Sequence, residues 1–258
     1  MEHTPSTILI FDLDNTLVDK NLVFEKAQKK MIEVIKGSMP SDDDLKILRE
    51  MDLILIKKKK KHLYPFKILA LSLWCYFHEK VSIKESIQRS EDIYAGKSNL
   101  LTKKMKNALT LAEKAAKMHD EILQNTPPTL FDNVKDVLQT LKNRKVTLVL
   151  LTEGNTLMQE KTVDTHDLKK FFDDIVICTE KDEHCFLEIK NHWENINGRN
   201  ARMYVVGDGI ERDIEPGNRI GAITIWKPGN FNPGTPGKGL KTPDFIVKDI
   251  KNVLSIVN

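Results

Sequence analysis

Short apolar runs that end in acidic or small polar residues recur along the chain and predict buried parallel strands. The first is Ile8–Phe11, a β-branched-rich run that stops at Asp12. After Pro128 similar runs predict strands at 146–151, 174–178, 203–206, 223–226 and 245–247, with helical periodicity at 157–170 and 184–197 between them. Repeated strand–helix units of this kind predict a parallel sheet with helices on both faces.

The long segment between the first strand and Pro127 has a different pattern. From about residue 21 to 125 the apolar positions follow helical spacing, and no stretch has the alternation of a strand. Glycine or proline near 37–40, 64–65, 95–96 and 126–128 predicts helix boundaries. We therefore expect an α/β fold with a Rossmann-like parallel-sheet core, residues 1–19 and 127–258, and an all-helical domain, residues 20–126, inserted after the first strand.

Composition narrows the class of protein. The chain has 258 residues, 40% of them apolar, and its 40 Lys and Arg nearly balance 37 Asp and Glu, which indicates neither a nucleic-acid partner nor a membrane surface. Three widely spaced cysteines disfavour a disulfide scaffold. With no export signal and no apolar stretch of membrane-spanning length, we expect a cytoplasmic protein. The oligomeric state is left open.

Two other patterns each have two interpretations. The five lysines Lys57–Lys61 are typical of a solvated helix end, although so basic a run could also attract a polyanionic ligand. Cys178, His184, Cys185 and His192 are residue types that bind zinc. Because His184 and Cys185 are adjacent, a convergent tetrahedral site is awkward, and we disfavour it.

Candidate chemistry lies at the strand ends, because ligands of open parallel sheets bind beyond the carboxyl ends of the strands. The residues that follow the first four core strands include Asp12, Asp14, Thr16, Thr152, Glu153, Gly154, Lys181, Asp208 and Asp213. Carboxylates gathered this densely repel one another and shift each other's pKa unless a cation lies between them. These carboxylates favour Mg²⁺ as that cation, since Mg²⁺ prefers hard oxygen ligands.

The order of these residues resembles the haloacid dehalogenase superfamily. The matching motifs are Asp12-x-Asp14-x-Thr16, Thr152, Lys181, and Gly207-Asp208-x4-Asp213. The resemblance covers the whole chain and implies a Rossmann-like core with a helical cap inserted after the first motif. A second aspartate, Asp14, is typical of the phosphatases and phosphomutases of that superfamily and is missing from its dehalogenases.

The resemblance also implies roles for the catalytic residues. Asp12 would be the nucleophile that becomes an aspartyl-phosphate, and Asp14 the general acid and then the general base. Thr152 would bind the phosphoryl oxygens and Lys181 would offset negative charge. Lys190 stays open as an alternative to Lys181, because Asp182 follows Lys181 where relatives often carry proline.

Metal and substrate ligands follow from the same resemblance. Mg²⁺ would be held by Asp12, the Asp14 carbonyl, Asp208 and Asp213, although Asp213 could instead only cap a helix. The residues expected on the substrate side are Thr16, Thr152, Glu153 and Gly154, with Lys20 and Asn21 able to touch the leaving group. Glu153 could instead face away from the phosphate.

The implied function is a Mg²⁺-dependent phosphatase acting on a small cytoplasmic phosphomonoester. A phosphomutase on the same core is the alternative enzyme, since it needs the same residues and a cap that excludes water. A non-catalytic regulatory protein of this fold is disfavoured, because Asp12, Asp14, Lys181 and Asp208 are all present.

Overall fold

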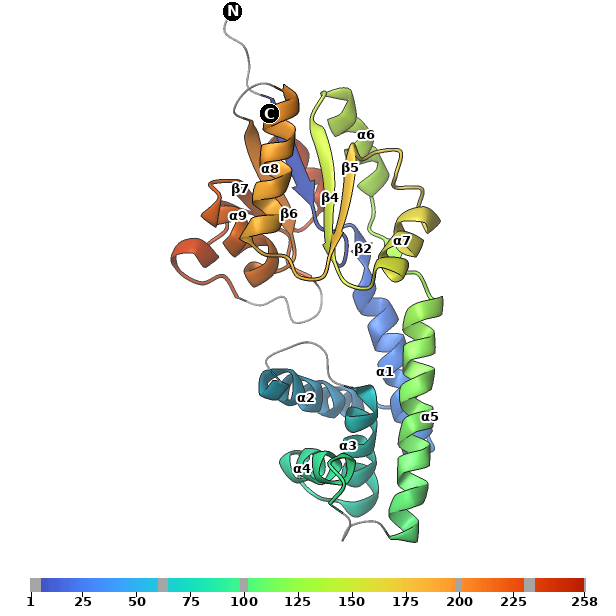
Figure 1. Cartoon of the computed structure of the whole chain (residues 1–258). Helices are drawn as coiled ribbons and strands as arrows, with labels where there is room; N and C mark the ends of the chain where they lie inside the picture. The colour runs from blue at the N-terminus through green and yellow to red at the C-terminus, as the bar shows by residue number, and fades with distance from the viewer. Residues whose placement is uncertain (1–5, 60–64, 98–101, 198–200, 230–234, 258) are drawn as a thin grey trace, which may run out of the picture. The chain divides into compact units, whose positions relative to one another are not determined.

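The structure is a computed structural model that describes residues 6–59, 65–97, 102–197, 201–229 and 235–257 (Figure 1). The chain divides into two compact units, one formed by residues 1–21 and 127–258 and the other by residues 22–126. Among the described residues, no helix has both the length and the apolarity that crossing a bilayer requires.

The first unit is built on a six-stranded sheet whose strand pairs are all parallel, in the order β5-β4-β1-β6-β7-β8. The strands are β1 (Thr7–Phe11), β4 (Thr147–Glu153), β5 (Asp174–Cys178), β6 (Arg202–Gly207), β7 (Ile223–Trp226) and β8 (Phe245–Ile246). The predicted α/β fold with a parallel sheet is confirmed. β1 lies between β4 and β6, where the strand order reverses, so the crevice of this sheet opens at the carboxyl ends of these three strands.

Alternate side chains of β1 enter two different apolar cores, one on each face of the sheet. Leu9 and Phe11 pack with α6 (Val134–Asn143) and the 3₁₀ helix η4 (Ile250–Ser255). Ile8 and Ile10 pack with α8 (Glu183–Asn197), which contributes Phe186 and Ile189. The period of two in a strand explains this division, and it places helices on both faces as predicted (Figure 1).

The second unit is helical throughout its described residues. Its helices are α1 (Lys20–Lys36), which begins two residues before the unit, α2 (Asp42–Lys59), α3 (Phe66–Glu79), α4 (Ile83–Tyr94) and α5 (Lys103–Asn125). The helix ends near 37–40, 95–96 and 126–128 and the start of α3 agree with the predicted breaks. α2 begins with a reciprocal cap, because Ser41 Oγ accepts from Asp44 N and Asp44 Oδ2 accepts from Ser41 N.

Three local features differ from the sequence-based expectation. α7 (Thr156–Thr165) ends before the predicted residue 170, because Asp167 adopts a φ of 55°. The boundary between α3 and α4 lies at Lys80, with a φ of 53°, where neither glycine nor proline marks it. A two-stranded antiparallel sheet, β2 (Val18–Asp19) with β3 (Thr129–Leu130), is too short to give a periodic pattern.

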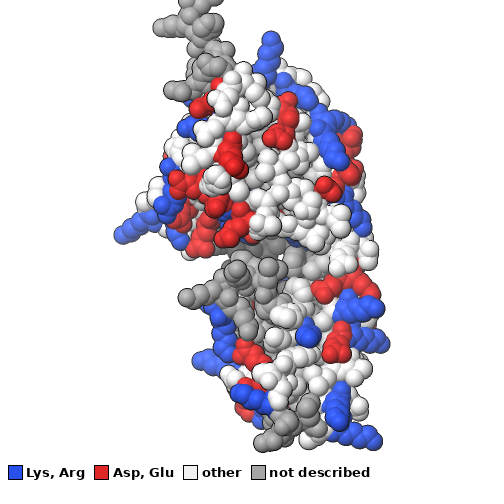
Figure 2. All heavy atoms as spheres, viewed as in Figure 1, with Lys and Arg blue, Asp and Glu red and all other residues white. Residues whose placement is uncertain are grey.

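Charged side chains of both signs are interspersed on the face drawn in Figure 2, in keeping with the balanced composition. The lysine run Lys57–Lys61 lies only partly within the described residues. Lys57 and Lys58 are exposed at the end of α2, and Lys58 pairs with Glu91 of α4 at 2.6 Å. The last two lysines of the run lie outside the described residues.

Candidate active site

The loop after β1 turns back sharply and keeps Asp12 at the sheet edge. The backbone N–H of Asp12 donates to the Val206 carbonyl at 2.9 Å, so this residue extends the pairing of β1 with β6. Asn15 adopts a φ of 63°, and Leu17 N donates to the Leu13 carbonyl at 2.9 Å. Thr16 is fully buried within this turn, and its Oγ1 has no hydrogen-bond partner among the described residues.

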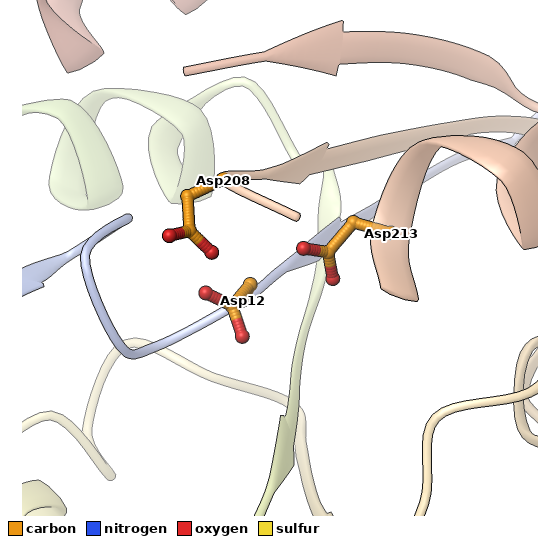
Figure 3. Close-up of side chains that lie close together, drawn as sticks. All are labelled: Asp12, Asp208 and Asp213. Atoms are coloured by element: carbon orange, nitrogen blue, oxygen red, sulfur yellow. The ribbon is translucent and has the colours of Figure 1, made fainter. Parts of the chain in front are cut away.

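Three carboxylates converge beyond the ends of β1 and β6. One oxygen from each of Asp12, Asp208 and Asp213 lies within 4.8 Å of the others (Figure 3). Asp208 follows β6, and Asp213 lies in the π-helical turn η2 (Ile210–Ile214). A Cβ atom on Gly207 would lie 2.2 Å from Asp213 Cγ, so only glycine leaves room for this approach.

Within the described part of the chain, this is the one cluster of three or more His, Cys, Asp or Glu side chains close enough to share a metal ion. The zinc set considered from the sequence does not converge. Cys178 Sγ lies against the Thr152 carbonyl and Cys185 Sγ against the Glu180 carbonyl, while His184 is exposed and pairs with Glu188.

Lys181 joins the cluster from the loop between β5 and α8. Its Nζ donates to Asp12 Oδ1 at 2.5 Å and to Asp213 Oδ1 at 2.7 Å. Glu153 Oε2 accepts from the Lys181 backbone N–H at 3.0 Å and fixes this loop. Burial by itself would lower the pKa of Lys181, but the two carboxylates raise it above its usual value. Lys190 lies on α8 and does not line the cavity around Asp12.

The cluster carries more negative charge than its lysine can neutralise. Burial, then the neighbouring charges of Asp12 and Asp213, raise the pKa of Asp208 to about 7. Burial also raises the pKa of Asp213, against the opposing effect of Lys181. Asp12 Oδ2 is buried and has no hydrogen-bond partner among the described residues. A donor set of hard oxygens with one oxygen unpartnered fits Mg²⁺.

Asp14 lies beside the cluster and is held by groups from two elements. Its Oδ2 accepts from Gln159 Nε2 of α7 at 2.9 Å and is paired with the Lys20 ammonium. Its Oδ1 has no partner within the described chain. Gln159 Nε2 also lies 3.1 Å from Thr152 Oγ1 and 2.9 Å from the Glu153 carbonyl. Sequence patterns missed Gln159, because a glutamine inside a helix carries no motif.

A second buried lysine, also missed from the sequence, holds the β1 loop. Lys227, directly after β7, donates from Nζ to the Asn15 carbonyl at 3.0 Å, and its Nζ lies 3.6 Å from the centroid of the Phe131 ring. Asn21 N donates to Asn15 Oδ1 at 3.2 Å. Lys20 and Asn21 therefore brace this loop through Asp14 and Asn15.

These side chains surround a cavity of about 40 Å³. Its lining residues are Asp12, Asp14, Asn15, Glu153, Lys181, Asp208, Arg212 and Asp213. Of the remaining residues expected at the site, Thr152 is fully buried at the end of β4 and Gly154 follows with a φ of 141°. A carboxylate with one oxygen fixed and one free, beside a second carboxylate, suits nucleophilic attack coupled to proton transfer.

Comparison with known proteins gives three consistent findings. The sequence profile of the haloacid dehalogenase-like hydrolases matches residues 7–221. N-acylneuraminate-9-phosphatase from Homo sapiens is 24% identical, over 94% of this chain and 90% of that protein, and the enzyme from Rattus norvegicus is equally similar.

Solved structures with the same fold include a haloacid dehalogenase-like hydrolase from Xanthomonas campestris, with a TM-score of 0.61 and 15% identity over 99% of this chain and 97% of that one. A second is the hydrolase YfnB from Bacillus subtilis, bound to magnesium, with a TM-score of 0.61 and 17% identity over 99% of this chain and 100% of that one. At these identities the likeness shows the fold.

Proposed function

Because the chain belongs to the haloacid dehalogenase-like hydrolase family, we propose that it is a Mg²⁺-dependent phosphatase that hydrolyses a small phosphomonoester through an aspartyl-phosphate. The observation that carries this proposal is the difference between the two carboxylate oxygens of Asp12. Its Oδ1 is held by Lys181, while its buried Oδ2 has no partner and lies in the carboxylate cluster. The relatives reported above are named as phosphatases, which also supports this proposal.

The carboxylate cluster would hold the metal. Its ligands would be the side chains of Asp12 and Asp208 with the Asp14 carbonyl, and Asp213 directly or through water. When bound, Mg²⁺ supplies positive charge next to the phosphoryl group and the attacking carboxylate.

Two half-reactions then use the two aspartates of the β1 loop. In the first, an Asp12 carboxylate oxygen forms a bond to phosphorus, the phosphorus–oxygen bond to the leaving group breaks, and Asp14 gives its proton to the departing oxygen. In the second, Asp14 takes a proton from water as the water oxygen attacks phosphorus, the bond between phosphorus and the Asp12 oxygen breaks, and phosphate leaves with Asp12 restored.

Neighbouring side chains position these groups. Lys181 fixes the orientation of Asp12 and balances part of its charge. The Thr152 hydroxyl accepts from Gln159 at 3.1 Å, which leaves its own O–H to donate to a phosphoryl oxygen. Gln159 positions both Thr152 and Asp14, since its amide is within hydrogen-bond distance of each.

The helical unit, residues 22–126, is proposed to act as the cap that selects the substrate and excludes water. N-acylneuraminate 9-phosphate is the first candidate substrate to test, because the curated relatives are named for it.

A panel of phosphorylated metabolites that includes N-acylneuraminate 9-phosphate, assayed for phosphate release with and without Mg²⁺, tests the function. We expect release from at least one compound, dependent on Mg²⁺ and absent in Asp12→Asn. An isomerised phosphate ester without free phosphate would indicate a phosphomutase instead. If a folded, Mg²⁺-loaded protein reacted with none of the compounds, this result would contradict the proposal that the protein is an enzyme.

A further inference from the structure

Arg212 occupies a position in the active site that the family motifs do not describe. It lies in η2, between Asp208 and Asp213, and its side chain is exposed while lining the same cavity as Asp12. A Cβ atom on Gly209 would lie 3.4 Å from Arg212 Nε and 3.3 Å from Arg212 Cβ. The arginine therefore folds back over the loop that begins at Asp208.

The guanidinium carries unused hydrogen-bond donors. It forms no hydrogen bond or ion pair with any residue that the structure describes. Lys181 differs, because its Nζ already donates to both Asp12 and Asp213. Arginine has five N–H donors in a planar fork, and that fork matches two oxygens of a phosphoryl group.

The charges around the cavity favour the binding of a divalent cation together with an anion. Five lining carboxylates face two lining cations, Lys181 and Arg212, and Lys20 pairs with one of the five, Asp14. The guanidinium of Arg212 stays charged at neutral pH, as arginine side chains in proteins do. A divalent cation would bring the sum of these charges to zero, so the cavity has no net positive charge to attract a phosphate dianion, and Arg212 is the lining cation with unused donors.

We propose that Arg212 is a substrate-binding residue whose guanidinium donates hydrogen bonds to the phosphoryl oxygens of the substrate. The cavity of about 40 Å³ holds one small group, so an anion that reaches Asp12 also lies within reach of Arg212. This inference rests on the proposed function and adds to it a phosphate ligand from the η2 turn.

Binding of inorganic phosphate to the Mg²⁺-loaded protein, measured by titration calorimetry, tests the proposal without turnover. Arg212→Gln should weaken phosphate binding by roughly 10- to 100-fold, the usual effect of losing charge-assisted hydrogen bonds. The phosphate affinity of Arg212→Lys should lie between those of the wild type and Arg212→Gln, because an ammonium keeps the charge but lacks the planar fork of donors. Arg219→Gln is the matched control, since Arg219 is an exposed arginine nearby that pairs with Glu215.

Titration of Mg²⁺ into the same variants separates the proposal from a purely electrostatic role. If Arg212 acted only through its charge, Arg212→Lys would bind both Mg²⁺ and phosphate as tightly as the wild type does, which would overturn the proposal. A wild-type protein that hydrolyses a phosphomonoester while the variant keeps its phosphate affinity overturns this inference alone. A wild-type protein that neither binds phosphate nor hydrolyses any ester overturns the proposed function together with it.

Discussion

The two oxygens of Asp12 differ in their surroundings, and this difference can be tested at a single atom. Asp12→Asn keeps the size of the side chain but replaces one oxygen with an amide that cannot accept a phosphoryl group. We expect turnover to fall by at least about a thousandfold with the fold retained. Phosphate release and circular dichroism, measured on one preparation, check this. Near-normal turnover in the folded variant would remove Asp12 from the nucleophile role.

Gly207 provides a second test at residue scale, because its missing side chain makes room for Asp213. In Gly207→Ala the new methyl would lie 2.2 Å from Asp213 Cγ and displace that carboxylate. We expect Mg²⁺ affinity to fall by about tenfold to a hundredfold, as when support for a metal ligand is lost. Calorimetric Mg²⁺ titration measures it, with thermal unfolding as the control for folding. Unchanged affinity would show that Asp213 does not help to hold the metal.

The raised pKa of Asp208 predicts a pH dependence. Its pKa is about 7 in the metal-free fold and about 3.8 in an unfolded chain, so its protonation stabilises the metal-free fold fully below about 3.8. This contribution is lost as pH rises through about 7, where Mg²⁺ can replace the proton. The increase in melting temperature on adding Mg²⁺ should therefore be larger at pH 8 than at pH 6. Equal increases at both pH values in the wild type would contradict the prediction.

At the scale of elements, the buried histidine of α5 predicts that the helical unit is sensitive to acid. His119 is 1% exposed and packs against Phe24 and Phe66. Burial lowers its pKa, against the opposing charge of Asp120. Since the folded-state pKa lies below the unfolded value of about 6.5, the neutral form stabilises the fold above about pH 6.5. That contribution is lost as pH falls.

Replacing this side chain should remove the acid sensitivity that it causes. His119→Phe keeps an aromatic ring in the same packing, so the free energy of unfolding should depend less on pH between about 5 and 7 than in the wild type. Urea unfolding at several pH values measures this. His184→Gln, at an exposed site, is the control. An unchanged slope in His119→Phe would show that another group is responsible.

Some features of the molecule can be predicted from its sequence and others cannot, and the difference has physical reasons. The core strands are apolar runs that end in polar residues, so both the sheet and its carboxyl-end residues could be predicted. Lys80 adopts a positive φ, which lysine rarely does, so no local signal predicts the boundary between α3 and α4. Gln159 and Arg212 approach the site only because helices and loops fold over the sheet edge, which depends on packing.

At the scale of the whole molecule, the division into two units predicts which parts of the chain metal binding stabilises. A ligand stabilises the unit that binds it, by about 2.7 kcal/mol at a hundred times its dissociation constant. Mg²⁺ alone should therefore slow hydrogen exchange in β1, β6 and their loops, and leave α3 of the helical unit unchanged. Exchange followed by mass spectrometry, with Ca²⁺ as a comparison ion, checks this. Equal protection of α3 would mean that the units unfold together.

The small antiparallel sheet of β2 and β3 has a consequence for engineering. Asp19 lies opposite Thr129, so the chain leaves the core and returns to it at neighbouring positions of one two-stranded ribbon. We expect that another insert, or a tight turn, can replace the residues between these positions without moving a core strand. The ribbon is therefore the position at which we expect this core to accept a different inserted domain.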